Sequence, residues 1–130
     1  MSNSTIDRPG MVLGDVVLDT ADPPQLAEFY SQLLNWPIVR TDEDWWSIQS
    51  EAGGTRLSFQ LALNHRPPSW PADDVPQQFH LDLDVARDEL PAAVAYAKSI
   101  GARLADNSAS AETFVVLLDP SGHPFCLCAC

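Results

Sequence analysis

The stretch 12–36, VLGDVVLDTADPPQLAEFYSQLLNW, sets the pattern on which the rest of the chain depends. Its first nine residues are mostly β-branched and apolar and end at a turn-like Ala-Asp-Pro-Pro, which predicts a strand over 12–20 followed by a helix. Asp22 suits the N-cap of that helix, and Pro23 suits its first position. Apolar residues then recur at helical spacing up to Asn35, a residue that tolerates the left-handed conformation of a C-cap.

Short strands follow the helix, separated by Asp-Glu-Asp and Ala-Gly-Gly turns, and complete a β-α-β-β-β unit. We place them at 36–41, 45–50 and 55–63. A proline-rich connector comes next, and after it the same order of elements returns. Its predicted elements are a strand at 78–85, a helix at 88–100 capped by Gly101, and strands at 102–105, 113–118 and 124–129.

The two units superimpose at an offset of about 65 residues, with Asp15 on His80 and Asp19 on Asp84. Each copy alone leaves a face unburied, so we expect the two to form one domain. The predicted fold class is α+β, with two β-α-β-β-β modules forming a curved mixed sheet around a pocket. The predicted organisation is a flexible N-terminal tail at 1–10 and a domain at 11–130, divided into module one (11–63), connector (64–77) and module two (78–130).

Composition narrows the function. The chain has 130 residues, 45% of them hydrophobic, and no apolar run that approaches the ~18 residues of a membrane span. Its start has no apolar stretch typical of a signal peptide. The net charge of −11 disfavours nucleic acid and anionic lipid as partners. We interpret the acidity as a source of solubility, with a cationic ligand or a metal ion as the alternative.

All three cysteines lie within the last five residues, at Cys126, Cys128 and Cys130. Alternate residues of one strand are poorly placed for a disulfide, so we expect reduced thiols and a cytoplasmic protein. On a strand these side chains share one face. They are interpreted either as small buried residues that fill the sheet or as a soft-metal site or reactive thiol at Cys126.

Four segments together resemble the vicinal-oxygen-chelate superfamily and, within it, the glyoxalase-like, bleomycin-resistance-like single-domain proteins. These are Val17-Leu18-Asp19 with Asp22, the helix LAEFYSQLLNW at 26–36, the strand FHLDL at 79–83, and the closing turn DPSGHPF at 119–125. The resemblance implies paired modules around a small-molecule pocket, a divalent metal held by pocket-facing strands, and a homodimer. The positions that it assigns to metal ligands are Asp15, then Gln60 or its neighbour Ser58, then His80 and Cys126.

This chain departs from the family pattern at those positions. Metal-dependent relatives usually have His or Gln on the first strand, His on the fifth and Glu on the last, and only His80 is kept. A thiol at Cys126 favours zinc over magnesium. The candidate metal ligands are therefore Asp15, His80 and Cys126, for one divalent ion whose presence the sequence leaves open.

Alternation places His80 on the pocket side of its strand, where it is either a hydrogen-bonded pocket histidine, a metal ligand or the candidate catalytic base. The other candidate ligand-binding residues are Trp46, Ser58 and Gln60. Trp46 and its neighbour Trp45 either pack in the core or an interface or stack on a flat ligand, and Trp70 has a place in the connector from which it could cover a pocket. We interpret His123 as a turn and packing residue.

Two functions remain. One is a lyase or dioxygenase of the vicinal-oxygen-chelate type that uses a metal held by Asp15, His80 and Cys126. The other is a protein that sequesters a small molecule, as the antibiotic-resistance branch of the family does. Because the last-strand glutamate is absent, we expect a glyoxalase-like pocket protein of unknown substrate that is not a true glyoxalase I; whether it is an enzyme stays open.

Overall fold

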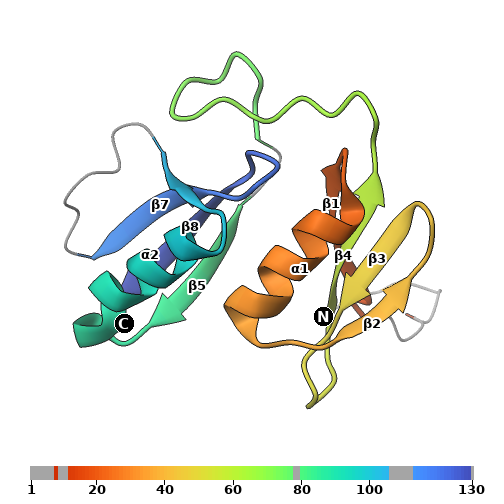
Figure 1. Ribbon diagram of the computed structural model, residues 1–130, viewed down its shortest axis with the longest axis horizontal. Helices are drawn as coiled ribbons and strands as arrows, with labels where there is room; N and C mark the ends of the chain where they lie inside the picture. The colour runs from red at the N-terminus through yellow and green to blue at the C-terminus, as the bar shows by residue number, and fades with distance from the viewer. Residues whose placement is uncertain (1–7, 9–11, 78–79, 106–112, 130) are drawn as a thin grey trace.

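The computed structural model describes residues 8, 12–77, 80–105 and 113–129, and it contains two β-α-β-β-β modules (Figure 1). The predicted α+β fold is confirmed. Most of the predicted tail at 1–10, and Cys130, lie outside the described residues. The elements of module one are β1 (Asp15–Thr20), α1 (Pro23–Leu34), β2 (Ile38–Thr41), β3 (Trp45–Ile48) and β4 (Arg56–Leu61).

Helix α1 begins and ends where its sequence predicts. The Asp22 side chain accepts a hydrogen bond from the Gln25 backbone N–H at 3.1 Å, and Pro23 follows in the first turn. At the other end Asn35 adopts the left-handed conformation, with φ of 56°. The helix buries one face, and this face determines which side of the first sheet the helix covers. The buried residues of α1 are Pro23, Leu26, Ala27, Phe29 and Tyr30.

Module two repeats the order with shorter elements. A 3-10 turn η1 (Arg87–Glu89) leads into its helix, and Gly101, with φ of 125°, follows the helix end. No helix in the described part of the chain is long and apolar enough to cross a membrane. The elements are β5 (Leu81–Val85), η1, α2 (Leu90–Ser99), β6 (Arg103–Leu104), β7 (Phe114–Leu118) and β8 (Pro124–Ala129).

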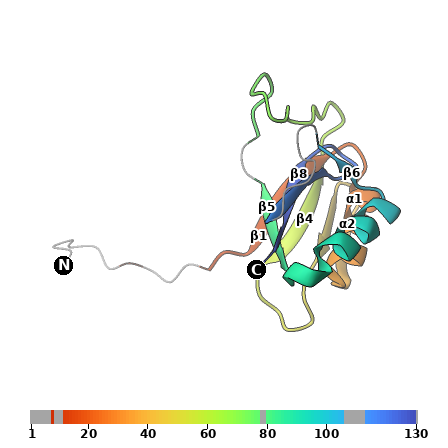
Figure 2. The ribbon, with the colours of Figure 1, turned by 90° about the vertical axis from the view of Figure 1, so that its left-hand side faces the viewer.

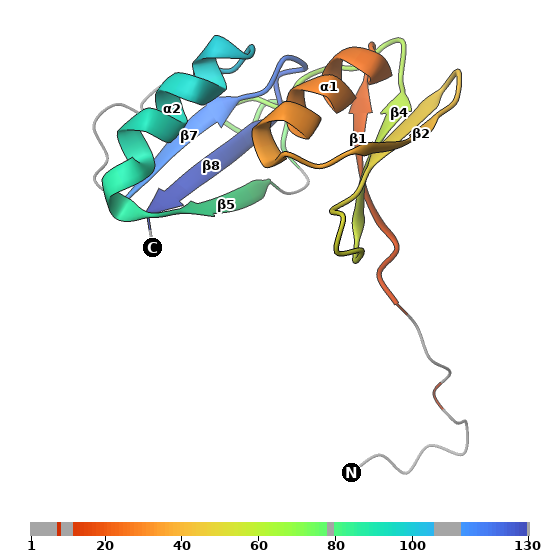
Figure 3. The ribbon, with the colours of Figure 1, turned by 60° about the horizontal axis from the view of Figure 1, so that its bottom comes forward.

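Both sheets have four strands and the same topology, in the orders β1-β4-β3-β2 and β5-β8-β7-β6. In each sheet the first and last strands of the module run parallel, and the remaining pairs are antiparallel. Figure 3 shows the two helices on the same side of the sheets. Each sheet therefore has a helix side and an outer face.

Alternation divides the strand residues between those two sides. We call the first outer face the side of the β1–β4 sheet that holds Asp15, Trp45, Ser47, Arg56 and Ser58. We call the second outer face the corresponding side of the β5–β8 sheet, which holds Asp82, Asp84, Cys126 and Cys128, with His80 just before β5. The helix sides hold the apolar residues between them.

The two modules pack against each other within one chain. One apolar core draws on both of them, and the ring centroids of Phe29 and Phe125 lie 5.9 Å apart, those of Tyr30 and Phe125 6.0 Å. The buried Tyr30 hydroxyl donates to the Asp119 carboxylate at 2.7 Å. The sequence leaves open whether modules pair within or between chains, and these contacts show a pairing within the chain.

The connector leaves β4 beyond one end of the sheets and returns to β5 (Figure 2). It rests on the closing turn, where a Cβ at Gly122 would lie only 2.5 Å from the Pro67 Cβ. The imidazole rings of His65 and His123 lie next to each other there, with centroids 4.8 Å apart. The connector is therefore seated on module two as well as joined to module one.

Candidate functional site

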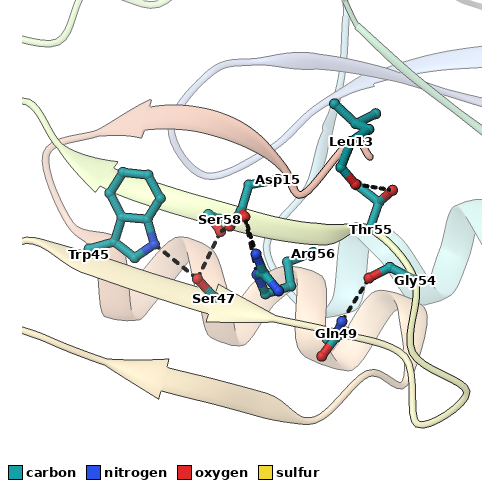
Figure 4. A network of polar contacts seen from close by, with 9 residues as sticks. All are labelled: Leu13, Asp15, Trp45, Ser47, Gln49, Gly54, Thr55, Arg56 and Ser58. Carbon is teal, nitrogen blue, oxygen red and sulfur yellow. Dashed lines mark hydrogen bonds and ion pairs between the residues drawn. The ribbon is translucent and has the colours of Figure 1, made fainter. Parts of the chain in front are cut away.

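The first outer face carries a chain of polar contacts that uses its own donors and acceptors (Figure 4). Arg56 donates from Nε and Nη2 to one oxygen of Asp15, at 3.1 and 2.6 Å. The other Asp15 oxygen accepts a short hydrogen bond from Ser58. The hydroxyls of Ser58 and Ser47 lie 2.7 Å apart, and the Trp45 indole N–H donates to Ser47 at 3.0 Å.

This network determines the charge state of Asp15. The hydrogen bonds from Arg56 lower the pKa of the Asp15 carboxyl, against a smaller opposing effect of burial. Ser47 and Ser58 are fully buried, so water does not compete for their hydroxyls. The predicted metal ligand Asp15 thus lies in an ion pair, and both of its oxygens already have partners.

The second outer face brings three different donor types together. One ligand atom each from His80, Asp82 and Cys126 lies within 4.8 Å of the others. The His80 Nε2 is 3.2 Å from an Asp82 oxygen, and Asp82 stands opposite Cys126 in the parallel register of β5 and β8. Imidazole, carboxylate and thiol suit zinc better than magnesium. Two of the three predicted metal ligands therefore meet here, and Asp82 takes the third place.

Cys126 is a buried thiol, 6% exposed. Burial raises its pKa to about 12, and the neighbouring Asp82 carboxylate adds to the shift. Without a cation beside it, this sulfur is protonated at neutral pH. A bound cation would reverse that balance, because it favours the thiolate.

Trp70 covers this cluster from the connector. It packs with Val116, Cys126 and their neighbours in a small second core, and its ring lies edge-on to His80 at 6.4 Å between centroids. The loop that holds it is closed by two hydrogen bonds between Ser69 and Val75, of 2.7 and 3.0 Å. Trp70 therefore contacts the cluster but is not part of the cavity wall described next, and its role as a cover over a pocket stays a prediction.

A cavity of about 240 Å³ lies between β1, the connector, the start of β5 and the closing turn. His80 belongs both to its wall and to the three-donor cluster. The wall combines titratable or polar groups with apolar surface. It is made of Val17, Leu18, Asp19, His65, Arg66, Pro68, Pro76, Gln77, His80, Leu81, His123 and Pro124.

The other predicted ligand-binding residues lie apart from this cavity wall. Trp46 packs against the main core on the helix side, and Trp45 occupies the outer face instead. Ser58 is buried in the Asp15 network, and Gln60 is exposed next to Trp45. Their role in binding stays a prediction.

Sequence reasoning missed four residues of these sites. Asp82 alternates with His80, so the spacing that selected the histidine could also have selected the carboxylate. Arg56 could be recognised only from the pairing of β1 with β4. His65 and Gln77 lie in the connector, where no periodicity fixes a side-chain direction.

Comparison with known proteins agrees with this architecture. The family model of the glyoxalase-like domain matches residues 15–128. No curated protein matches the chain.

Solved structures match in fold at low identity. A glyoxalase/bleomycin resistance protein/dioxygenase family enzyme from Burkholderia phytofirmans PsJN is 18% identical with a TM-score of 0.69, over 90% of this chain and 97% of that chain. A glyoxalase/dioxygenase from Nostoc punctiforme is 16% identical with a TM-score of 0.67, over 97% of both chains. A glyoxalase/bleomycin resistance protein from Albidiferax ferrireducens T118 is 15% identical with a TM-score of 0.61, over 90% and 97%.

Proposed function

Because the chain belongs to the glyoxalase-like domain family, we propose that it binds a small organic molecule in the cavity between β1 and β5 and is not a glyoxalase I. The cavity itself supports this most directly. It brings three histidines, an arginine and a glutamine from separate parts of the chain to one apolar hollow. A concave apolar site with a few convergent polar groups is the usual form of a ligand pocket.

The last strand argues against the glyoxalase I reaction. Cys126 stands where metal-dependent relatives have glutamate, and its pKa of about 12 keeps the thiol protonated at neutral pH. In the absence of a metal ion, a protonated thiol does not serve as a general base. His80 is the remaining candidate for proton transfer, at the wall of the cavity.

A fragment screen on the ¹⁵N-labelled chain tests the binding proposal. We expect hits to shift the amide signals of cavity residues. Val17→Phe, which fills the cavity, should weaken the binding of these hits more than tenfold. Val39→Phe is the matched control, because Val39 is half exposed on the edge strand β2 and is not part of the cavity wall. Hits that bind elsewhere, or that bind Val17→Phe unchanged, would contradict the proposal.

A second candidate function is metal-dependent chemistry at the same wall, as a lyase or dioxygenase. The compact His80, Asp82 and Cys126 cluster supports it, since its donor set fits a soft divalent ion such as zinc. Such an ion would act as a Lewis acid on an oxygen of the bound ligand. The protein groups would orient that ligand, with His80 shared between cluster and cavity.

Elemental mass spectrometry on untagged protein purified without chelator tests this candidate. We expect near one zinc per chain, with His80→Ala and Cys126→Ala each losing it. Asp84→Asn and Cys128→Ala are matched controls, because that pair has the same register one step further along β5 and β8. No zinc uptake after incubation, or equal loss in the controls, would exclude the cluster as a zinc site.

The predicted homodimer is also part of the proposal. The apolar side chains of Leu104 on the edge strand β6 and Phe114 on β7 are 40% and 47% exposed, and a second copy would cover them. Light scattering coupled to gel filtration distinguishes one copy from two. The cytoplasmic location stays a prediction from the reduced thiols.

A further inference from the structure

All three histidines of the chain lie at the wall of the cavity. His65 comes from the connector, His80 from just before β5 and His123 from the closing turn. Arg66 and Asp19 add one charge of each sign to the same wall. The whole chain has eighteen acidic and seven basic residues, a net charge of −11. The cavity wall is therefore much less acidic than the chain as a whole, and protonated imidazoles would make it positive.

His65 and His123 form a closely spaced pair within this wall. Their ring centroids are 4.8 Å apart, and the rings are tilted by 37°. His65 Nε2 lies 3.0 Å from the Ser121 carbonyl oxygen. His123 Nε2 lies 2.6 Å from the Asp19 carbonyl oxygen. Because a carbonyl oxygen only accepts, each Nε2 carries a proton, and any further proton must go to Nδ1.

The spacing of this pair makes its charge sensitive to an anion nearby. Two imidazolium rings side by side repel each other, which opposes the protonation of both. Imidazole changes charge between about pH 5 and 8, so this repulsion acts close to neutral pH. An anion in the cavity would lie near both rings and offset the repulsion. Binding of the anion would then favour the doubly protonated pair, and by linkage a lower pH would favour binding of the anion.

Other charged groups of the wall act on the same anion. Arg66 follows His65 in the connector and supplies a permanent positive charge, while Asp19 at the end of β1 opposes it. His80 also lines the wall, but its Nε2 is 3.2 Å from an oxygen of Asp82. The histidine pair is therefore the part of the wall whose charge can change without involving the three-donor cluster.

Asp119 is a second group near His123 that could take up a proton. Its buried carboxylate accepts from the Tyr30 hydroxyl and from the backbone N–H groups of Ser121 and His123. Burial raises the pKa of the Asp119 carboxyl, and the positive charge of His123 opposes this shift. Substitutions of the two histidines distinguish protonation of the pair from protonation of Asp119.

From these observations we infer that the cavity binds a small organic carboxylate, and that protonation of His65 and His123 promotes this binding. The inference rests on the cavity being the ligand site proposed above. A volume of about 240 Å³ is below the usual range for drug-sized molecules and suits a single ring with its carboxylate. The apolar residues of the wall, among them Val17, Pro68 and Pro124, would cover the ring.

Benzoate and benzamide are matched probes, because they share the ring and differ in charge. Each is titrated at pH 6 and at pH 7.5, at constant ionic strength, into the ¹⁵N-labelled full chain and followed at the amide signals of cavity residues. Benzoate is ionised at both pH values, so a change in its affinity reports on the protein. We expect benzoate to bind at least about fivefold more tightly at pH 6, and benzamide affinity to change by less than about twofold.

Variants assign this pH dependence to its groups. His65→Gln and His123→Gln each remove a titrating ring and keep an N–H donor, and benzamide binding shows whether the cavity is intact. Each should reduce the pH dependence of benzoate binding, and the double variant should reduce it to less than about twofold. His80→Gln should retain it. Arg66→Gln should weaken benzoate binding at both pH values, whereas Arg87→Gln, exposed on η1 and outside the wall, is the matched control.

The contrary outcomes separate this inference from the proposed function. Benzoate affinity that is independent of pH, or benzamide binding without benzoate binding, would overturn the inference and leave the ligand site intact. A pH dependence that persists in the double variant would assign the proton to Asp119 or another group, and its loss only in His80→Gln would assign the carboxylate to the three-donor cluster. Either result overturns the inference. Probes that bind only outside the cavity would overturn the proposed function together with it.

Discussion

The two outer faces belong to sheets of the same topology, but their polar side chains are arranged differently. On the first, Asp15 is bonded to Arg56 and Ser58, and the contacts continue through Ser47 to Trp45 (Figure 4). On the second, His80, Asp82 and Cys126 converge within 4.8 Å, with Asp82 59% exposed. The polar groups of this network on the first face are therefore bonded to one another, and these bonds stabilise the fold.

The comparison shows how a duplicated module can divide its tasks. The fold offers ligand positions on both sheets, but an arginine next to the first-strand carboxylate supplies the cation internally. A cation from solution would have to displace Arg56 from Asp15, whereas on the second face nothing comparable competes within the described cluster. We therefore expect ligand chemistry to concentrate on module two.

The largest expected effect is on the alkylation rate of the Cys126 thiol on the second face, compared between the folded and the unfolded chain. With a pKa of about 12, Cys126 should react with iodoacetamide at pH 8 at least a hundredfold more slowly than in the urea-unfolded chain. Asp82→Asn should raise that rate, because the Asp82 carboxylate raises the thiol pKa. Peptide mass spectrometry over time measures both rates; a folded-state rate within tenfold of the unfolded one would contradict the buried, protonated thiol.

The second effect concerns stability of the first face. Asp15→Ala leaves Arg56 and Ser58 without their shared acceptor and should lower the free energy of unfolding by about 2 kcal/mol. Asp84→Ala removes an exposed carboxylate of the second face and should change it by less than about 0.5 kcal/mol. Urea unfolding at pH 7 measures both. Equal losses would mean that the two faces do not differ as described.

The pH dependence of the first face gives a smaller effect with a defined sign. The lowered pKa of Asp15 contributes stability that is present above its ordinary value of 3.8 and is lost as the pH falls through the folded-state value. The difference in unfolding free energy between the wild type and Asp15→Asn should therefore shrink below pH 3.8. A difference that stays constant down to pH 2 would show that ionisation of Asp15 is not involved.

The smallest expected effect lies at the end of the network. Trp45→Phe removes the indole N–H that donates to Ser47 and should lower the free energy of unfolding by about 1 kcal/mol. Tyr96→Phe removes an exposed hydroxyl contact to the Gln32 carbonyl, 3.3 Å long, and should have a smaller effect. Thermal and urea unfolding compare the two variants. A larger loss of unfolding free energy in Tyr96→Phe than in Trp45→Phe would contradict the stabilising role of the Trp45 hydrogen bond.

Local chemistry made most of the fold predictable. Asp22 and Asn35 occupy the two ends of α1 because capping depends on neighbouring backbone groups, and strand β8 matches its predicted range. Helix α2 was harder, since its N-terminus has no side-chain cap and begins as a 3-10 turn.

The sites were less predictable because their contacts are non-local. Asp15 and Arg56 are 41 positions apart, and only the register of β1 against β4 shows that they pair. For His80 and Cys126, alternation within their own strands was enough to place each on a face, and the family resemblance suggested their roles.

The bond between Tyr30 and Asp119 has a consequence for how the protein melts. Each group belongs to a different module, both are buried, and the same carboxylate also accepts from the backbone of Ser121 and His123. If one module opened alone, it would leave these polar groups unpaired in the other and expose the shared aromatic core. We therefore expect the two similar units to unfold as a single cooperative body, and neither half to persist when expressed by itself.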